Sequence, residues 1–124
     1  MLYEQELTKQ IIGAAIEVQR ALGPGLLESV YQQCLRREFE LRDLQFERER
    51  SLTVEYKGVQ LDCELRPDSV VDGKVVVELK AVGAMEPVFE AQLLTYMRLT
   101  GCRIGHLINF NVPKLTRGIT RRVL

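Results

Sequence analysis

Hydrophobic residues recur at steps of three and four in three separate stretches of the chain. The first stretch covers residues 4–22, the second runs from about 26 to 42, and the third covers 85–100. This spacing places the apolar side chains on one face of an amphipathic helix. A Gly-Pro-Gly sequence ends the first stretch, and Gly101 follows the third, where a glycine cap is expected. The pattern therefore predicts three helices, each with one buried face.

Between the second and third helices the pattern changes to the alternation that is typical of strands. Residues 52–56 and 59–65 alternate around a Lys-Gly turn, which predicts a hairpin with one buried face. Residues 68–80, DSVVDGKVVVELK, form a second hairpin, and its three consecutive valines indicate a strand that is covered on both faces. Residues 103–110 give a further strand, and residues 119–123 give a short last one.

The predicted order of elements is ααβββαβ, followed by the short last strand. This order predicts one α/β domain over residues 1–124, built on a mixed sheet whose antiparallel part comes first. Hydrophobic residues make up 46% and charged residues 27%, the balance of a soluble globular protein. No apolar run approaches the roughly 18 residues of a membrane span. The N-terminal residues also lack the apolar core of a secretory signal.

The formal net charge is zero, which argues against the strongly basic surface of many nucleic-acid-binding domains. The end of the chain departs from this average, because it carries four cations and no acid: Lys114, Arg117, Arg121 and Arg122. This cluster is either one edge of a phosphate-binding surface or a solvated terminal strand, and the sequence leaves both interpretations open.

Cysteine and histidine give little indication of a metal or redox site. Cys34, Cys63 and Cys102 are scattered and have no CxxC spacing. They are expected to be small buried side chains in a reducing cytoplasm, rather than parts of a disulfide framework or a zinc site. His106 is the only histidine, and no partner or nucleophile motif accompanies it, so we interpret it as structural.

Charged side chains interrupt the second hairpin. Alternation places Val76, Glu78 and Lys80 on one face of its second strand, with Glu78 and Lys80 about 6–7 Å apart at the strand's C-terminal end. Clefts form at that end of open α/β sheets. A two-residue turn would put Asp68 on the opposite face. A three-residue turn with Gly73 in the left-handed region, or a bulge, would pair Asp68 near Val76 and bring it to the same face.

The combination of two carboxylates and one lysine has a specific chemical use. Two carboxylates held together repel each other unless a cation lies between them or one takes a proton. Oxygen ligands without cysteine or histidine suit Mg²⁺, with Mn²⁺ as the alternative. A neighbouring lysine can orient or deprotonate a water, or stabilise charge on a phosphorane. Asp68, Glu78 and Lys80 therefore suit metal-assisted phosphodiester hydrolysis, and the competing interpretation is an ordinary surface Glu–Lys pair.

The surrounding motifs point to a known family. RPD at 66–68 and ELK at 78–80, nine residues apart, have the form of the PD-(D/E)XK nuclease signature. Three further stretches match its frame: GLLESVY at 25–31, EAQLLTY at 90–96 and GHLINF at 105–110. Over about residues 5–123, the chain resembles the GxxExxxR family of the PD-(D/E)XK superfamily. Gly25 and Glu28 match the motif that names this family, whereas Gln32 occupies its Arg position.

This resemblance implies a restriction-endonuclease-like core, in which helices flank a four-stranded mixed sheet. It implies that Asp68 and Glu78 are metal ligands and that the backbone carbonyl of Leu79 is a third. Lys80 would be the catalytic lysine. Glu28 would approach the metal directly or through a water.

The resemblance also implies that Gln92 and Tyr96, a QxxxY element, line the site. The two residues are four apart, so they share one face of their helix. Plainer accounts remain open: Tyr96 can be a core aromatic, and Glu28 is favoured by the helix dipole in the first turn of its helix.

The sequence and the resemblance together predict a cytoplasmic, Mg²⁺-dependent nuclease that acts on DNA or RNA. The alternative is a non-catalytic nuclease-fold module that binds nucleic acid or protein, which the neutral charge and the short length favour. A plain α/β domain is a third interpretation, and it requires Asp68 and Glu78 to point to opposite faces. No membrane partner is expected, and a homodimer would enlarge the footprint on duplex nucleic acid.

Overall fold

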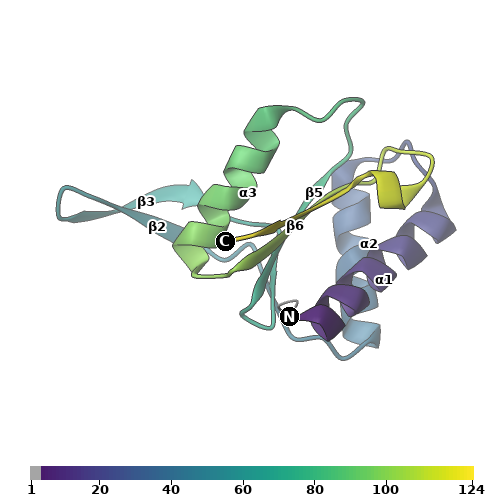
Figure 1. Ribbon diagram of the computed structural model, residues 1–124, viewed down its shortest axis with the longest axis horizontal. Coiled ribbons are helices and arrows are strands. Elements are labelled where there is room, and N and C mark those ends of the chain that lie inside the picture. The colour runs from purple at the N-terminus through teal and green to yellow at the C-terminus, as the bar shows by residue number, and fades with distance from the viewer. Residues whose placement is uncertain (1–3) are drawn as a thin grey trace.

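The helices agree closely with the predicted spans. The computed structural model describes residues 4–124, so the first three residues of the predicted domain lie outside it. It contains α1 (Gln5–Leu22), α2 (Glu28–Leu41) and α3 (Pro87–Thr100). Gly101 ends α3 with a φ of 76°, as the sequence predicts. Figure 1 shows α1 and α2 on one side of the sheet and α3 on the other. Within residues 4–124, no helix combines the length and the apolar character needed to cross a membrane.

The main sheet has five strands in the order β1-β4-β5-β6-β7. They are β1 (Phe46–Arg48), β4 (Ser69–Val71), β5 (Val75–Lys80), β6 (Ile104–Asn109) and β7 (Ile119–Val123). β5 and β6 are parallel and are connected through α3, whereas the other neighbours are antiparallel. The mixed α/β architecture is confirmed. The sheet has five strands rather than the expected four, because the short β1 and β7 pair with β4 and β6 at its edges.

The remaining strands, β2 (Leu52–Tyr56) and β3 (Val59–Leu65), form a separate two-stranded sheet. This hairpin projects from the body of the molecule (Figure 1). The predicted buried face is wrong: Leu52 is buried, but Tyr56 is 59% exposed and Val59 is 55% exposed. Alternation fixes the direction of side chains along a strand, and here no second layer covers the far half of the hairpin within residues 4–124.

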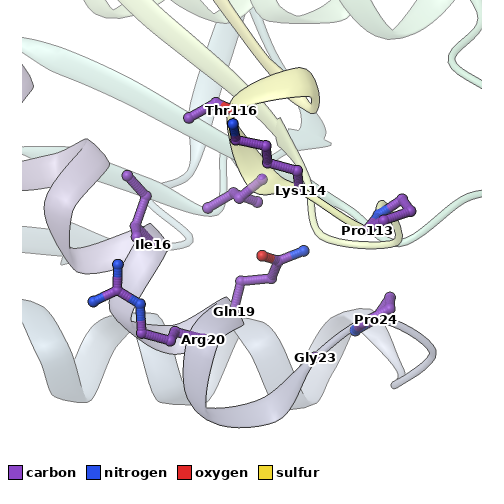
Figure 2. Close-up of a pocket in the computed structure, with 9 residues that line it drawn as sticks. Ile16, Gln19, Arg20, Gly23, Pro24, Pro113, Lys114 and Thr116 are labelled. Carbon is purple, nitrogen blue, oxygen red and sulfur yellow. The ribbon is translucent and has the colours of Figure 1, made fainter.

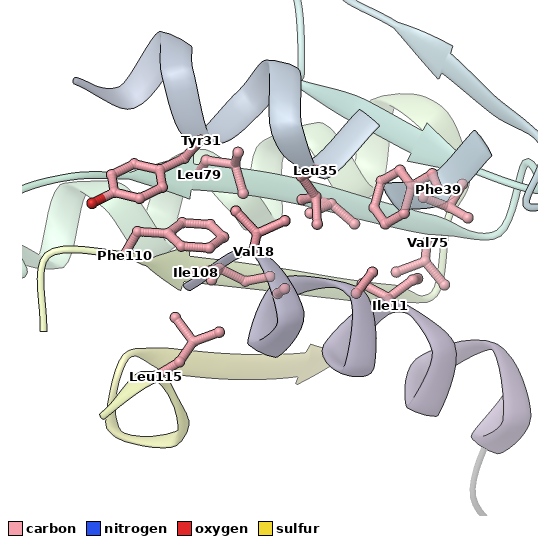
Figure 3. Close-up of a cluster of buried hydrophobic side chains, with 14 of the residues drawn as sticks. Ile11, Val18, Tyr31, Leu35, Phe39, Val75, Leu79, Ile108, Phe110 and Leu115 are labelled. Atoms are coloured by element: carbon pink, nitrogen blue, oxygen red, sulfur yellow. The ribbon is translucent and has the colours of Figure 1, made fainter. Parts of the chain in front are cut away.

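Two apolar clusters cover the two faces of the main sheet. The first lies between the sheet and helices α1 and α2, and the second lies under α3. Figure 3 shows side chains of the first cluster, with Val75 and Leu79 of β5 directed toward it. Val76 belongs to the second cluster. Because side chains alternate along a strand, Glu78 and Lys80 share the α3 face with Val76.

Helix α3 approaches the sheet closely at Gly105 of β6. A Cβ atom at this position would lie 2.6 Å from the sulfur of Met97 and 2.9 Å from a methyl carbon of Leu93. Any side chain here would push α3 away from the sheet. The glycine therefore sets the distance at which α3 presents its polar side chains to β5.

Candidate functional site

The connection between β4 and β5 determines where Asp68 lies. Val71 pairs with Val75, so three residues form the turn between the strands. Within this turn Asp72 has a φ of 54° and Gly73 a φ of 65°. Of the turns that the sequence leaves open, the structure has the three-residue turn with Gly73 in the left-handed region.

The register then places the two carboxylates opposite each other. Extending the β4–β5 ladder by one pair beyond Ser69 sets Asp68 against Glu78. The predicted pairing of Asp68 near Val76 is wrong, because a three-residue turn shifts the register one residue further along β5 than a two-residue turn does. Directly opposed residues of an antiparallel pair share a face. Asp68, Glu78 and Lys80 therefore lie on one side of the sheet.

The two carboxylates are also held by backbone N–H groups of the facing strand segment. The Asp68 N–H donates to Oε1 of Glu78 at 2.6 Å. The Leu79 N–H donates to Oδ2 of Asp68 at 2.8 Å. These reciprocal hydrogen bonds continue the strand pairing through side chains at the point where β4 begins, and they fix the orientation of both acids.

Helix α2 holds Asp68 from a second direction, through residues that sequence reasoning missed. The Gln32 amide nitrogen donates to Oδ1 of Asp68 at 2.6 Å. Nη2 of Arg36 donates to the Asp68 carbonyl oxygen at 2.9 Å. Glu28, Gln32 and Arg36 are spaced by four residues and so share one helical face. This spacing is the sequence signal that could have identified Gln32 and Arg36.

Burial and mutual repulsion raise the proton affinity of the acids. Glu78 is only 5% exposed. Burial, and then the Asp68 carboxylate, raise the pKa of Glu78 to about 8. Burial also raises the pKa of Asp68, against the opposing hydrogen bond from Leu79. At neutral pH this pair either shares a proton or requires a cation nearby.

Glu28 lies further out, at the start of α2. Its pKa is raised by burial and then by the charge of Asp68. The turn that precedes it is fastened by Tyr31, whose hydroxyl donates to the Gly23 carbonyl at 2.6 Å and accepts the Leu26 N–H at 3.1 Å. The first turn of α2 is thereby fixed relative to the α1 end.

Lys80, Gln92 and Tyr96 form a polar chain between β5 and α3. Nζ of Lys80 donates to Oε1 of Gln92 at 3.5 Å, and the Gln92 amide nitrogen donates to the Tyr96 hydroxyl at 3.1 Å. The Lys80 ammonium also lies 4.7 Å from the centroid of the Phe89 ring. Burial, followed by the charge of Glu78, raises the pKa of Tyr96. The ammonium is therefore positioned by α3, beside an open groove of about 540 Å³ lined by Phe89 and Gln92.

The carboxylate arrangement fits a hard divalent cation with few protein ligands. Within residues 4–124, no group of three or more His, Cys, Asp or Glu side chains has the geometry of a metal site, so Glu28 is not brought together with Asp68 and Glu78 as a third ligand. Mg²⁺ commonly keeps several waters and takes only one or two carboxylates from the protein. The pair of Asp68 and Glu78 suits that mode of binding.

Two other predicted side chains lie away from this site. His106 is fully buried, and neither ring nitrogen has a hydrogen-bond partner within residues 4–124. Burial, with the nearby charge of Arg121, lowers its pKa to about 4. In the basic C-terminal cluster, Arg122 pairs with Glu90 of α3, so this guanidinium is already engaged by an acid.

The sequence was compared with models of known protein families, with curated proteins and with solved structures. The family model of the PD-(D/E)XK nuclease superfamily matches residues 5–123. The chain belongs to the PD-(D/E)XK nuclease superfamily. No curated protein and no solved structure matches the chain. The mixed α/β architecture agrees with the restriction-endonuclease-like fold of this superfamily, and membership indicates nuclease activity on nucleic acid.

Proposed function

We propose that this PD-(D/E)XK protein is a Mg²⁺-dependent nuclease whose site is formed by Asp68, Glu78 and Lys80. The observation that carries this proposal is the pair of hydrogen bonds from the Asp68 N–H to Glu78 and from the Leu79 N–H to Asp68, which fixes one buried and one half-buried carboxylate on one face. Mg²⁺, or Mn²⁺ in its place, balances a charge that the protein alone leaves repulsive. The same proposal assigns the chain to the GxxExxxR family, on the matches at Gly25 and Glu28.

Asp68 and Glu78 would hold the metal ion, and the Leu79 carbonyl is a suitable third oxygen. The Leu79 N–H points toward Asp68, and the N–H and C=O of one strand residue point to the same edge. The Lys80 carbonyl, one residue further along, accepts a hydrogen bond from the Phe110 N–H on the opposite edge of the strand. The Leu79 carbonyl therefore points to the same edge as Asp68. Glu28 would approach the ion through a water. A cation bound here would supply Lewis-acid stabilisation of the phosphate oxygens.

Lys80 activates the attacking water by orienting it, and its positive charge stabilises the phosphorane. The water oxygen bonds to phosphorus while the bond to the leaving oxygen breaks, and the proton that the water loses passes to the solvent, which in turn protonates the leaving oxygen. Gln92 holds the ammonium toward the groove, and Tyr96 holds Gln92. Gln92 and Tyr96 thus act as positioning residues.

The chain is proposed to act in the cytoplasm, because Cys34, Cys63 and Cys102 are all free. A homodimer would enlarge the contact that so small a domain makes with a duplex. The proposed substrate is DNA or RNA, since the site chemistry acts on the phosphodiester that they share.

The test is cleavage of single-stranded, duplex and branched DNA and RNA in Mg²⁺ or Mn²⁺. Wild-type protein is expected to cleave at least one of these substrates, and chelation of the metal is expected to stop cleavage. Asp68→Ala and Lys80→Ala should abolish cleavage without loss of helical circular dichroism. If wild-type protein cleaves none of these substrates with either metal, the proposal is wrong.

One observation favours a second function, a non-catalytic binding module. Both carboxylate oxygens of Asp68 already accept hydrogen bonds, from Gln32 and Leu79, so the acid also has a structural use. The neutral net charge agrees with this alternative. Calorimetric titration with Mn²⁺ separates the two functions, because a binding module has no need for a cation at Asp68 and Glu78.

A further inference from the structure

A hollow of about 490 Å³ lies outside the carboxylate site, between the C-terminal half of α1 and the segment after β6. The segment includes η1 (Leu115–Arg117), a short 3₁₀ turn. Figure 2 shows Gln19 and Arg20 on the α1 side and Lys114 and Thr116 on the facing side. A volume of this size lies within the usual range for small-ligand sites.

The walls of the hollow combine an apolar lining with positive charge. Ile16, Pro24, Pro113 and Leu115 supply the apolar surface. Arg20 and Lys114 add a cation on each side, and both side chains are exposed. Across residues 4–124, neither cation forms an ion pair with an acid. The hollow therefore offers two cations that the protein itself does not neutralise.

Gln19 adds a directional polar group. Its amide nitrogen donates to the Val112 carbonyl, which leaves the amide oxygen as an acceptor. In Figure 2 this oxygen lies on the side of Gln19 that faces the space between Arg20 and Lys114. These features match the parts of a nucleotide. The apolar surface suits the base, the Gln19 oxygen suits the hydrogen-bond donors of the base, and the two cations suit the phosphate.

The hollow lies close to the proposed catalytic site along the chain. Pro24, on its rim, is four residues before Glu28, so their Cα atoms are at most about 14 Å apart. The rim is also tied to α2, because the Tyr31 hydroxyl donates to the Gly23 carbonyl. Successive phosphates of a B-form strand advance by about 3.4 Å. A strand that passes Glu28 therefore reaches the rim of the hollow within about four nucleotides.

We propose that this hollow binds one nucleotide of the substrate strand, a few nucleotides away from the scissile phosphate. Its phosphate contacts Arg20 and Lys114, and its base lies on the apolar wall next to Gln19. This inference rests on the proposed nuclease function and names a strand-binding subsite for it. A free mononucleotide has the same chemistry and would be an effector rather than substrate, so the test separates these two sources.

The test compares two double variants that change the net charge equally. Arg20→Ala/Lys114→Ala removes the hollow's cations, and Lys9→Ala/Arg98→Ala removes two exposed cations elsewhere. Binding of a fluorescein-labelled single-stranded oligonucleotide is measured by anisotropy without metal over a series of salt concentrations. The first variant should bind about 10-fold more weakly, with a log–log salt slope smaller by about 1.5. The second should bind like wild type.

Equal weakening in both variants would mean general electrostatic attraction and would overturn the subsite. Unchanged binding in the first variant would overturn it as well. Adenosine monophosphate distinguishes a strand from a free nucleotide as the occupant of the hollow. If the hollow is a subsite for a strand, adenosine monophosphate should bind much more weakly than the oligonucleotide. If the free nucleotide binds as tightly as the strand, the hollow is an effector site and the proposal fails.

Cleavage kinetics separate a failure of this inference from a failure of the nuclease function. In the Arg20→Ala/Lys114→Ala variant, KM should rise for oligonucleotides that reach the hollow while kcat stays unchanged. The same variant should cleave a dinucleotide as wild type does. Normal KM with active cleavage would overturn the subsite alone. Tight, Arg20-dependent strand binding without any cleavage would support the subsite and contradict the nuclease proposal.

Discussion

The β4–β5 and β2–β3 hairpins have similar turn residues and different environments. Each turns through a residue with positive φ followed by glycine, Asp72-Gly73 in one and Lys57-Gly58 in the other. Both hairpins carry valines on their strands. Yet Val76 of β5 is fully buried, and Val59 of β3 is 55% exposed. The comparison shows that strand chemistry alone does not determine which hairpin carries a site.

The difference lies in what covers each hairpin. Clusters on both faces enclose β4 and β5, so a carboxylate at the end of β5 loses water and its pKa rises. β3 has exposed carboxylates at Asp62 and Glu64, which stay in water. Burial from both sides therefore raises the proton affinity of an acid on a strand.

The largest expected effect is on cleavage. Glu78→Gln keeps the size of the side chain but removes its charge, and it should reduce the Mg²⁺-dependent cleavage rate by at least about 100-fold. The matched change on the exposed hairpin, Glu55→Gln, should leave the rate unchanged. Initial rates on the substrate found for wild-type protein provide the measurement. Equal rates for both variants would remove the functional distinction between the hairpins.

The next effect is on stability. Val76→Ala removes two buried methyl groups and leaves a cavity between β5 and α3, so the free energy of unfolding should fall by about 2 kcal/mol. Val59→Ala on the exposed hairpin should change it by less than about 0.5 kcal/mol. Urea denaturation gives both values. A comparable loss for Val59 would mean that the β2–β3 hairpin is covered in solution.

The pH dependence of stability should also differ between the hairpins. The pKa of Glu78 is raised from 4.5 to about 8 in the folded protein. Its contribution to the free energy of unfolding is therefore fully present below pH 4.5 and is lost as pH rises through 8. Between these two pH values the folded state holds one more proton than the unfolded state, so the free energy of unfolding should fall by up to about 1.4 kcal/mol per pH unit. Metal-free Glu78→Gln should lack this slope, and Glu55→Gln should keep it.

His106 contributes with the opposite sign and in a lower window. Its pKa falls from 6.5 to about 4 on folding, so its contribution is present above pH 6.5 and is lost as pH falls toward 4. Denaturation of Glu78→Gln between pH 6.5 and 8 avoids this window. A wild-type slope that survives in Glu78→Gln over that range would contradict the assignment to Glu78.

The smallest effect concerns the two turns. Gly73 and Gly58 have φ values of 65° and 82°, where a Cβ atom is strained. Gly73→Ala and Gly58→Ala should each cost about 1 kcal/mol of stability. Only Gly73→Ala should also weaken Mn²⁺ binding, because that turn sets the register of Asp68 against Glu78. Equal Mn²⁺ affinities in the two variants would show that the register tolerates the change.

Sequence reasoning predicted what depends on local periodicity and turn chemistry. The helices follow from patterns within a few residues. The shared face of Asp68 and Glu78 was predicted only for a three-residue turn or a bulge, and the sequence left the choice of turn open. The last strand, Ile119–Val123, was also placed correctly.

The rest depends on contacts between distant parts of the chain. The three-residue strand β1 is too short to show a period and is specified by its pairing with β4. The exposure of β2–β3 depends on which elements pack over it. The hydrogen bond from Gln32 to Asp68 requires knowledge of how α2 docks on the sheet. Since that docking is long-range, the departure from Arg at position 32 could be noted but its contact could not be predicted.

The most direct test of the account is calorimetric titration of Mn²⁺ into wild type, Asp68→Asn and Glu78→Gln, with Asp62→Asn as the exposed-hairpin control. We expect one binding event in wild type and in Asp62→Asn, and its loss in both site variants. Binding that is equal in all four proteins, or absent from wild type, would contradict the claim that Asp68 and Glu78 form a metal site.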